Sequence, residues 1–251
     1  MTLRFSTGLR NNLCGNKGFA STFAKGSINI YSGSQPASAD AAVTGTLLGT
    51  VPLSSGALTQ EVRANATITV SGASGSINTV TVGGLNIIPD GTVPFNTDAA
   101  TTATDLCNAS NRNGLFDATV AGAVVTVLAP RGSGTTYNAV ALATTVTTLS
   151  ATSSGNFGSG AAAVNGLTFA APASGAVSKS GTWSFNGIAV GTAGWFRLVA
   201  SSADGGGAST TLERLDGSIA VSGADMNLSN IAITIGAPNT IDTFTYTQPA
   251  S

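Results

Sequence analysis

The sequence contains no histidine, and only 8% of its 251 residues are charged. Without histidine, the Ser-His-Asp and Cys-His arrangements are excluded, and the commonest zinc and iron ligand is missing. The two cysteines, Cys14 and Cys107, are too few for a sulfur metal site, and we expect both to be buried, unreactive thiols. The sequence therefore predicts no catalytic, cofactor or metal site, and a protein that is not an enzyme.

The few residues that could carry chemistry have plainer interpretations. Glu213 and Asp216, with Arg214 between them, are expected to form surface ion pairs. Trp183 and Trp195 are expected to lie in strands and to pack in the core, rather than to serve as platforms for a sugar. A glycan-cleaving enzyme would need a credible pair of carboxylates, and the sequence offers none.

Low charge also bounds the fold and the partners. Long amphipathic helices need charged faces that this chain cannot supply, whereas its 32 glycines favour many tight turns. The net charge is −1 and the basic residues are scattered, so we expect no nucleic-acid partner. No apolar run reaches a membrane-spanning length, and no secretory signal is visible, so we expect synthesis and retention in a cytoplasm.

The first part of the chain predicts a short or broken helix followed by strands. Residues 5–26 carry the helical pattern, and strands are expected at 27–31 and 47–53. A second group of elements follows, with strands at 66–70, 79–82 and 85–88 and a helix at 99–109 that Thr97 or Asp98 caps. A hairpin at 116–120 and 124–128 and a strand at 139–149 complete a small α+β domain over 60–150.

Residues 151–163 are rich in Ser, Gly and Ala and predict a linker, with Gly158 and Gly160 in flexible chain. Turn signals at Asn165-Gly166, Asn186-Gly187, Asp204-Gly205 and Asp216-Gly217 divide the remaining residues. Short strands are expected between them, at 167–169, 176–177, 182–185, 194–200, 211–215, 218–221, 231–235 and 241–246. This spacing is typical of a β-sandwich or small β-barrel, so the predicted fold class is mainly β.

Two separated blocks of the sequence resemble one family. The first block contains "RFSTGLRNNL" and "GSINIYSGSQPASADAAVTGTLLGTV". The second contains "GLTFAAPASGAVSKSGTWSFNGIAVGTAGWFRLVA" and "RLDGSIAVSGADMNLSNIAITIGAPNTIDTFTYTQPA". Both are similar to small structural proteins of tailed bacteriophages, in which the two blocks are nearly contiguous. The resemblance implies that residues 1–58 and 156–251 build one β domain, and that 60–150 is an inserted domain similar to small β–α–β modules of phage virions.

The resemblance implies a virion protein made in the host bacterial cytoplasm. We expect a capsid decoration or cement protein on the outer shell, a homo-oligomer whose partner is the major capsid protein. The alternative is a tail, baseplate or fibre component that binds tail proteins or a host receptor. Neither role requires nucleic acid, a membrane or a cofactor.

The N-terminal segment, residues 4–25, holds four of the ten basic residues. We expect it to be a docking arm that folds on an acidic partner surface, with a solvated segment as the plainer alternative. Deleting residues 1–25 is then expected to leave the β domain folded. The candidate docking residues are Arg4, Phe5, Arg10, Lys17, Phe19, Phe23 and Lys25.

Overall fold

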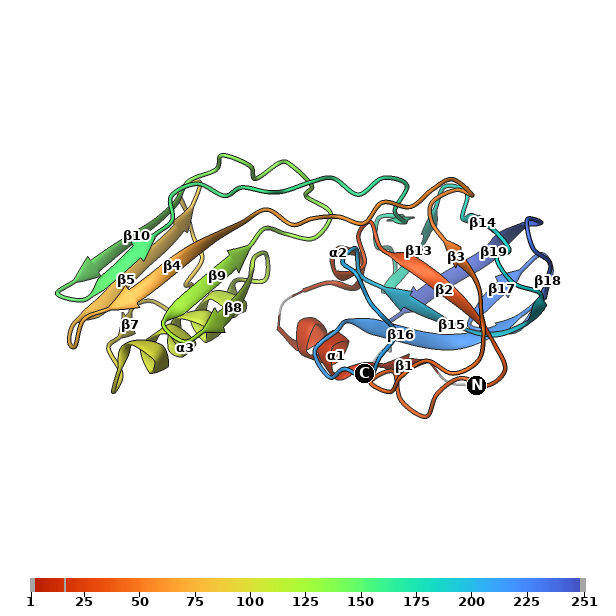
Figure 1. The fold of residues 1–251 in the computed structure, drawn as a ribbon, viewed down its shortest axis with the longest axis horizontal. Helices are drawn as coiled ribbons and strands as arrows, with labels where there is room; N and C mark the ends of the chain where they lie inside the picture. Colours follow the sequence, from red (N-terminus) through yellow and green to blue (C-terminus); the bar gives the residue numbers. More distant parts are fainter. Residues whose placement is uncertain (1–2, 16, 249–251) are drawn as a thin grey trace. The chain divides into compact units, whose positions relative to one another are not determined.

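Both ends of the chain contribute strands to one β-rich unit. The computed structural model describes residues 3–15 and 17–248. Unit 1 comprises 3–14, 18–61 and 163–248, and unit 2 comprises 15, 17 and 62–162. In Figure 1 the red and blue elements interleave in unit 1, and the yellow to green elements make up unit 2. The fold is mainly β, with a sandwich-like or barrel-like domain built from both chain ends and a small inserted α+β domain.

Unit 1 contains two short helices and eleven described strands. The helices are α1 (Thr7–Cys14) and α2 (Phe19–Thr22). The strands are β1 (Arg4–Phe5), β2 (Ser27–Ser32), β3 (Leu47–Val51), β12 (Thr168–Phe169), β13 (Ala176–Ser180), β14 (Ser184–Asn186), β15 (Gly191–Val199), β16 (Arg214–Ala220), β17 (Met226–Leu228), β18 (Ala232–Ile233) and β19 (Pro238–Thr247), which together make one sheet.

The sheet of unit 1 curls on itself. Its main order is β12-β13-β19-β17-β16-β15-β2-β3, with β1 added to β16, β14 to β19 and β18 to β15. A Cβ on Gly49 of β3 would lie only 2.2 Å from the ring of Phe185 in β14. Glycine at this position therefore lets β3, the last strand of the order, approach β14, which pairs with β19.

The central strands of unit 1 bury both of their faces. Alternation along β2, β15 and β16 places Ile28, Phe196 and Leu215 in the hydrophobic core on one face. The other face carries Trp195 and Arg197, which are also fully buried. Here the covering layer is irregular chain rather than sheet or helix: the two loops 33–46 and 200–213 supply its contacts.

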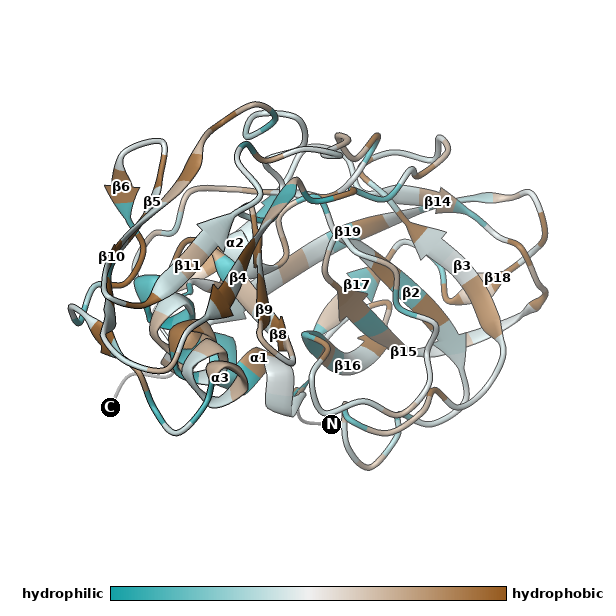
Figure 2. Ribbon diagram, turned by 60° about the vertical axis from the view of Figure 1, so that its left-hand side comes forward, coloured by the Kyte–Doolittle hydropathy of each residue, from teal (hydrophilic) through white to brown (hydrophobic). Residues whose placement is uncertain are grey.

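Unit 2 consists of two small sheets and one long helix. The strands are β4 (Asn65–Ser71), β5 (Ser76–Val82), β6 (Leu85–Asn86), β7 (Val93–Pro94), β8 (Asp117–Ala121), β9 (Val124–Leu128), β10 (Leu142–Thr147) and β11 (Ser150–Ser153). One sheet has the order β10-β5-β6 with β7 on β5, and the other has the order β11-β4-β9-β8. Figure 2 shows brown, hydrophobic stretches on β4, β8 and β9, beside α3 (Ala99–Ser110).

The sequence correctly predicts the helix α3 and its capping residue. Asp98 is the N-cap, and its carboxylate accepts a 2.7 Å hydrogen bond from the Thr101 N–H. After the helix, a 3₁₀ turn (Asn111–Asn113) leads to β8. The Asn111 amide accepts from the Ala118 N–H and donates to the Ala118 carbonyl, at 2.7 and 3.0 Å. This side chain therefore occupies part of the free edge of β8, where another strand would otherwise pair.

Two sequence-based assignments were wrong. The expected linker 151–163 contains most of β11 and the buried ring of Phe157, because its small residues pair with β4 instead of remaining solvated. Gly158 in the same segment bridges Asn65. The expected turn at Asp216-Gly217 lies in the middle of β16. Gly217 is needed there because a Cβ would lie 2.6 Å from the Phe196 ring, not because the chain reverses.

Candidate interaction surfaces

A buried ion pair crosses the central strands of unit 1. The Arg197 Nε and Nη2 donate to the two carboxylate oxygens of Asp216, each at 2.7 Å, and both side chains are fully buried. This fork-to-fork geometry uses the strongest hydrogen bonds that proteins make between side chains. Arg197 Nη1 also donates to the Ala41 carbonyl at 3.1 Å, so the pair holds loop 33–46 against the sheet. Burial raises the pKa of Asp216, and Arg197 opposes that shift.

A second ion pair holds the loop 200–213. Arg214 Nε and Nη2 donate to the carboxylate of Asp204, at 2.6 and 2.5 Å. Asp204 also accepts from the Gly206 N–H, and the Gly206 carbonyl accepts from Val43 in loop 33–46. The prediction of surface ion pairs around Arg214 and Asp216 was therefore wrong. Both residues are buried, because loops cover the second face of β16. These contacts attach both loops to the sheet and to each other.

Both tryptophans are core residues, as predicted. Trp195 stacks on Tyr31 with ring centroids 4.5 Å apart, and the Arg197 guanidinium lies 5.6 Å from its ring centroid. Trp183 packs edge-on against Phe169 at 5.3 Å. Neither ring is exposed, so neither forms a platform for a sugar in this structure.

The aromatic candidates of the N-terminal segment lie inside unit 1. Phe19 and Phe23 belong to its hydrophobic core, with ring centroids 4.9 Å apart, and Phe19 also stacks on Tyr246 at 4.0 Å. Phe5 packs edge-on against Tyr246 at 6.0 Å. The segment is thus folded onto its own β domain rather than held ready for a partner. Deleting residues 1–25 would remove part of the core, which corrects the expectation that the domain survives this truncation.

The basic candidates of the same segment have different local environments. Arg4 lies opposite Asp216 in the β1–β16 ladder, and Arg10 donates to the Thr7 hydroxyl at 2.9 Å. Lys17 forms an ion pair with Asp117 within unit 2. Lys25 borders a recess.

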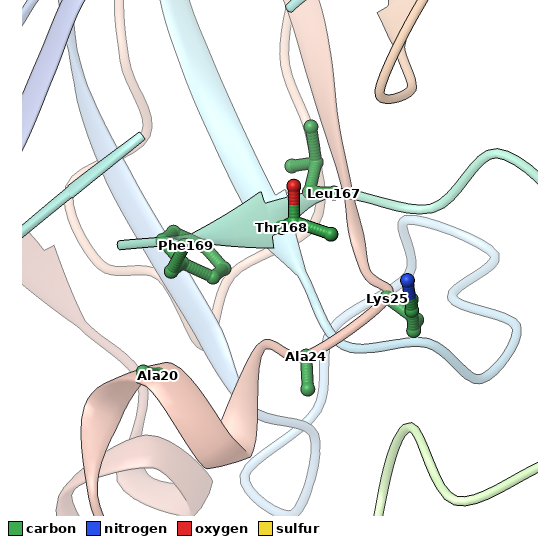
Figure 3. Close-up of a pocket in the computed structure, with 6 residues that line it drawn as sticks. All are labelled: Ala20, Ala24, Lys25, Leu167, Thr168 and Phe169. Carbon is green, nitrogen blue, oxygen red and sulfur yellow. The ribbon is translucent and has the colours of Figure 1, made fainter. Parts of the chain in front are cut away.

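That recess lies between α2 and β12 and has a volume of about 200 Å³. Its lining residues are Ala20, Ala24, Lys25, Leu167, Thr168 and Phe169. Figure 3 shows the α2 segment on one side, β12 on the other and Lys25 beside them. Four of the six lining side chains are apolar, so the recess is a small hydrophobic site with a cation at its border.

A second exposed feature is an aliphatic tip formed by Ile188, Val190 and Ile235. These side chains are 58%, 70% and 65% exposed. The Gly236 N–H donates to the Gly187 carbonyl at 2.8 Å, so the two loops that carry the tip lie side by side. No charged residue occurs in 181–196 or 226–241. The tip is therefore an uncharged apolar contact surface.

The two cysteines differ in environment. Cys107 is buried in unit 2, as predicted, and burial raises the pKa of its thiol. Cys14, at the end of α1, is exposed, which corrects the expectation that both thiols are buried. The reason is that the last turn of α1 presents this position away from the core that holds Leu9.

Comparison with known proteins gives no further assignment. No family model, curated protein or solved structure matches this chain. Within residues 3–15 and 17–248, no group of three Cys, Asp or Glu side chains is placed to hold a metal ion. In the same residues, no helix is long and apolar enough to cross a membrane.

Proposed function

We propose that this chain is a structural protein of a tailed-bacteriophage virion, and specifically a capsid decoration or cement protein on the outer shell. The observation that carries the proposal is the aliphatic tip, an exposed apolar surface on a unit whose two long loops are held to the sheet by buried ion pairs. Such a surface gains free energy by leaving water, at about 25 cal/mol per Å² of apolar area before association costs.

Its partners would be other virion proteins. We propose the major capsid protein as the principal partner and a second copy of this chain as the neighbour that covers the aliphatic tip. An uncharged aliphatic surface complements itself, whereas a charged partner would bury its charge there without a counter-charge. The protein would be made in the host bacterial cytoplasm and then carried on the particle, with no role for nucleic acid, membrane or enzymatic chemistry.

A tail, baseplate or fibre component is the second candidate, and one feature of unit 2 favours it. Buried and more exposed residues alternate along the strands of the β11-β4-β9-β8 sheet. On the more exposed face, threonines of neighbouring strands stand opposite one another. Thr126 faces Thr67 and Thr119 across the ladder, and Thr69 faces Thr152. Hydroxyl groups in rows would suit a neutral polar receptor on a host cell.

The test uses particles of a phage that encodes this chain, prepared with its gene deleted. Purified protein is added to intact particles and to isolated tails, and each mixture is sedimented. Saturable binding to heads at a fixed ratio to the major capsid protein supports the decoration role, and binding to tails alone supports the second candidate. Failure to bind either one contradicts the proposal.

The variant Val190→Asp separates the tip from the rest of the surface. Because it places a charge on the most exposed residue of the tip, we expect it to weaken self-association of the protein in sedimentation velocity. Val120→Asp, at an exposed valine of β8 in unit 2, is the matched control and should leave self-association unchanged.

A further inference from the structure

The recess between α2 and β12 has rigid walls. Leu167 is fully buried at its base, and the Phe169 ring is held edge-on by Phe19 and Trp183, at 5.9 and 5.3 Å. A volume of about 200 Å³ is below the usual range for drug-sized ligands and is suited to a single side chain. The recess is therefore shaped for one apolar group presented by a larger molecule.

The backbone of Lys25, the cationic residue at the border of the recess, is fixed by its conformation and hydrogen bonds. Lys25 has a φ of +59°, a conformation that residues other than glycine rarely adopt. Its N–H donates to the Leu167 carbonyl at 3.0 Å, and Leu167 donates to Gly26 at 2.9 Å. Gly166 makes this approach feasible, because a Cβ there would lie 2.3 Å from the Lys25 carbonyl oxygen. The backbone of Lys25 is thus positioned so that its side chain borders the recess.

A second lysine lies close to the same site. Lys179 stands directly opposite Phe169 in the β12–β13 ladder, and opposed residues of a ladder project from the same face. Among the residues that the structure describes, no carboxylate lies within ion-pair distance of Lys25 or Lys179. The chain has only three lysines, and the third, Lys17, is paired with Asp117. Two unpaired cations therefore flank one small apolar recess.

From this geometry we propose that the recess binds an acidic segment of a partner protein. An apolar side chain of that segment enters between Ala20, Ala24 and Phe169, and neighbouring carboxylates pair with Lys25 and Lys179. The inference rests on the proposed function for the location of that partner on the virion, and it adds the chemistry by which the partner is recognised. Charge complementarity of this kind steers the encounter and fixes its register.

The first test measures the chemistry of the recess without any particle. The uniformly ¹⁵N-labelled full chain is titrated with the peptide acetyl-Glu-Leu-Glu-amide, and with acetyl-Lys-Leu-Lys-amide as the opposite-charge control. We expect amide shifts confined to residues 20–25, 167–169 and the neighbourhood of Lys179 with the acidic peptide, and much weaker shifts with the basic one. Equal shifts with both peptides, or shifts elsewhere only, would overturn the inference.

Matched variants separate charge from cavity. Lys25→Glu should weaken binding of the acidic peptide by up to about fivefold, the upper end of what one surface ion pair contributes, while Lys25→Arg should retain it. Ala24→Leu should also weaken binding, because it fills the recess without changing charge. Arg112→Glu, at an exposed cation of unit 2, is the control and should bind as the wild type does. Wild-type affinity in both Lys25→Glu and Ala24→Leu would overturn the inference.

The second test uses the gene-deleted particles and distinguishes this inference from the proposed function. If wild type binds particles and Lys25→Glu does not, both are supported. If both proteins bind equally well, the assignment of the recess to a virion partner is overturned while the proposed function stands. If wild type binds no particle, the proposed function fails, and the peptide titration alone decides the chemistry of the recess.

Discussion

Removing the charge of Asp216 should destabilise unit 1 strongly. In Asp216→Asn the guanidinium of Arg197 remains fully buried. It loses the carboxylate that accepts two of its hydrogen bonds and neutralises its charge. Breaking one partner of a buried ion pair costs about 3–5 kcal/mol. Typical domains have only about 5–15 kcal/mol of stability, so this one change should remove a large part of it.

Tryptophan fluorescence during guanidinium chloride unfolding is the assay. The chain has two tryptophans, Trp183 and Trp195, and both lie in unit 1, so the signal reports this unit alone. Asp242→Asn, at an exposed carboxylate of β19, is the control and should change the free energy of unfolding by no more than about 0.5 kcal/mol. A loss below about 1 kcal/mol in Asp216→Asn would refute the reasoning.

A double replacement tests whether the cost comes from the unpaired charge. Arg197→Met combined with Asp216→Leu removes both charges and retains apolar volume. Replacement of a whole buried ion pair by apolar residues is often neutral, so the double variant should recover the larger part of the loss. If it is as unstable as Asp216→Asn, the pair acts through loop contacts such as the Ala41 carbonyl rather than through charge balance.

Three further predictions follow from other parts of the structure. Phe23→Ala should cost unit 1 about 3–5 kcal/mol in the same fluorescence assay, because the ring is fully buried; a change near zero would mean that the N-terminal segment is dispensable. Cys14 should react with a thiol reagent in the native protein and Cys107 only after unfolding, and equal rates would contradict their assigned burial. Asp98→Ala should lower the unfolding midpoint of unit 2, followed by circular dichroism. The hydrogen bond from the Thr101 N–H lowers the pKa of Asp98, so its contribution is present above the unfolded pKa and is lost as pH falls through the folded value; a difference between wild type and variant that persists at about pH 2 would contradict this origin.

Local patterns predicted most of the elements. Period-two alternation located the strands near 27–32, 65–71 and 124–128, and the capping residue located α3, because these signals act within a few residues of the chain. Both tryptophans lie in the core, as expected, although Trp183 precedes β14 rather than lying in a strand.

The errors come from contacts between distant residues. The Asp-Gly pair at 216–217 is a turn signal locally, yet Asp216 pairs with Arg197 from the neighbouring strand and Gly217 lies against the Phe196 ring. The N-terminal segment reads as a polar arm because its glycines and basic residues dominate the composition, while Phe19 and Phe23 reach the core. The recess was missed altogether, since Lys25 and Phe169 are brought together only by the pairing of residues 25–26 with Leu167.

The amount of this protein in the virion tests the central claim most directly. Particles of the phage that encodes the chain are purified, and the chain is quantified against the major capsid protein by mass spectrometry. The proposed role predicts a ratio near one or a simple fraction such as a third. A ratio of a few per cent would place the protein in the tail or connector, and its absence from the particle would contradict a virion role.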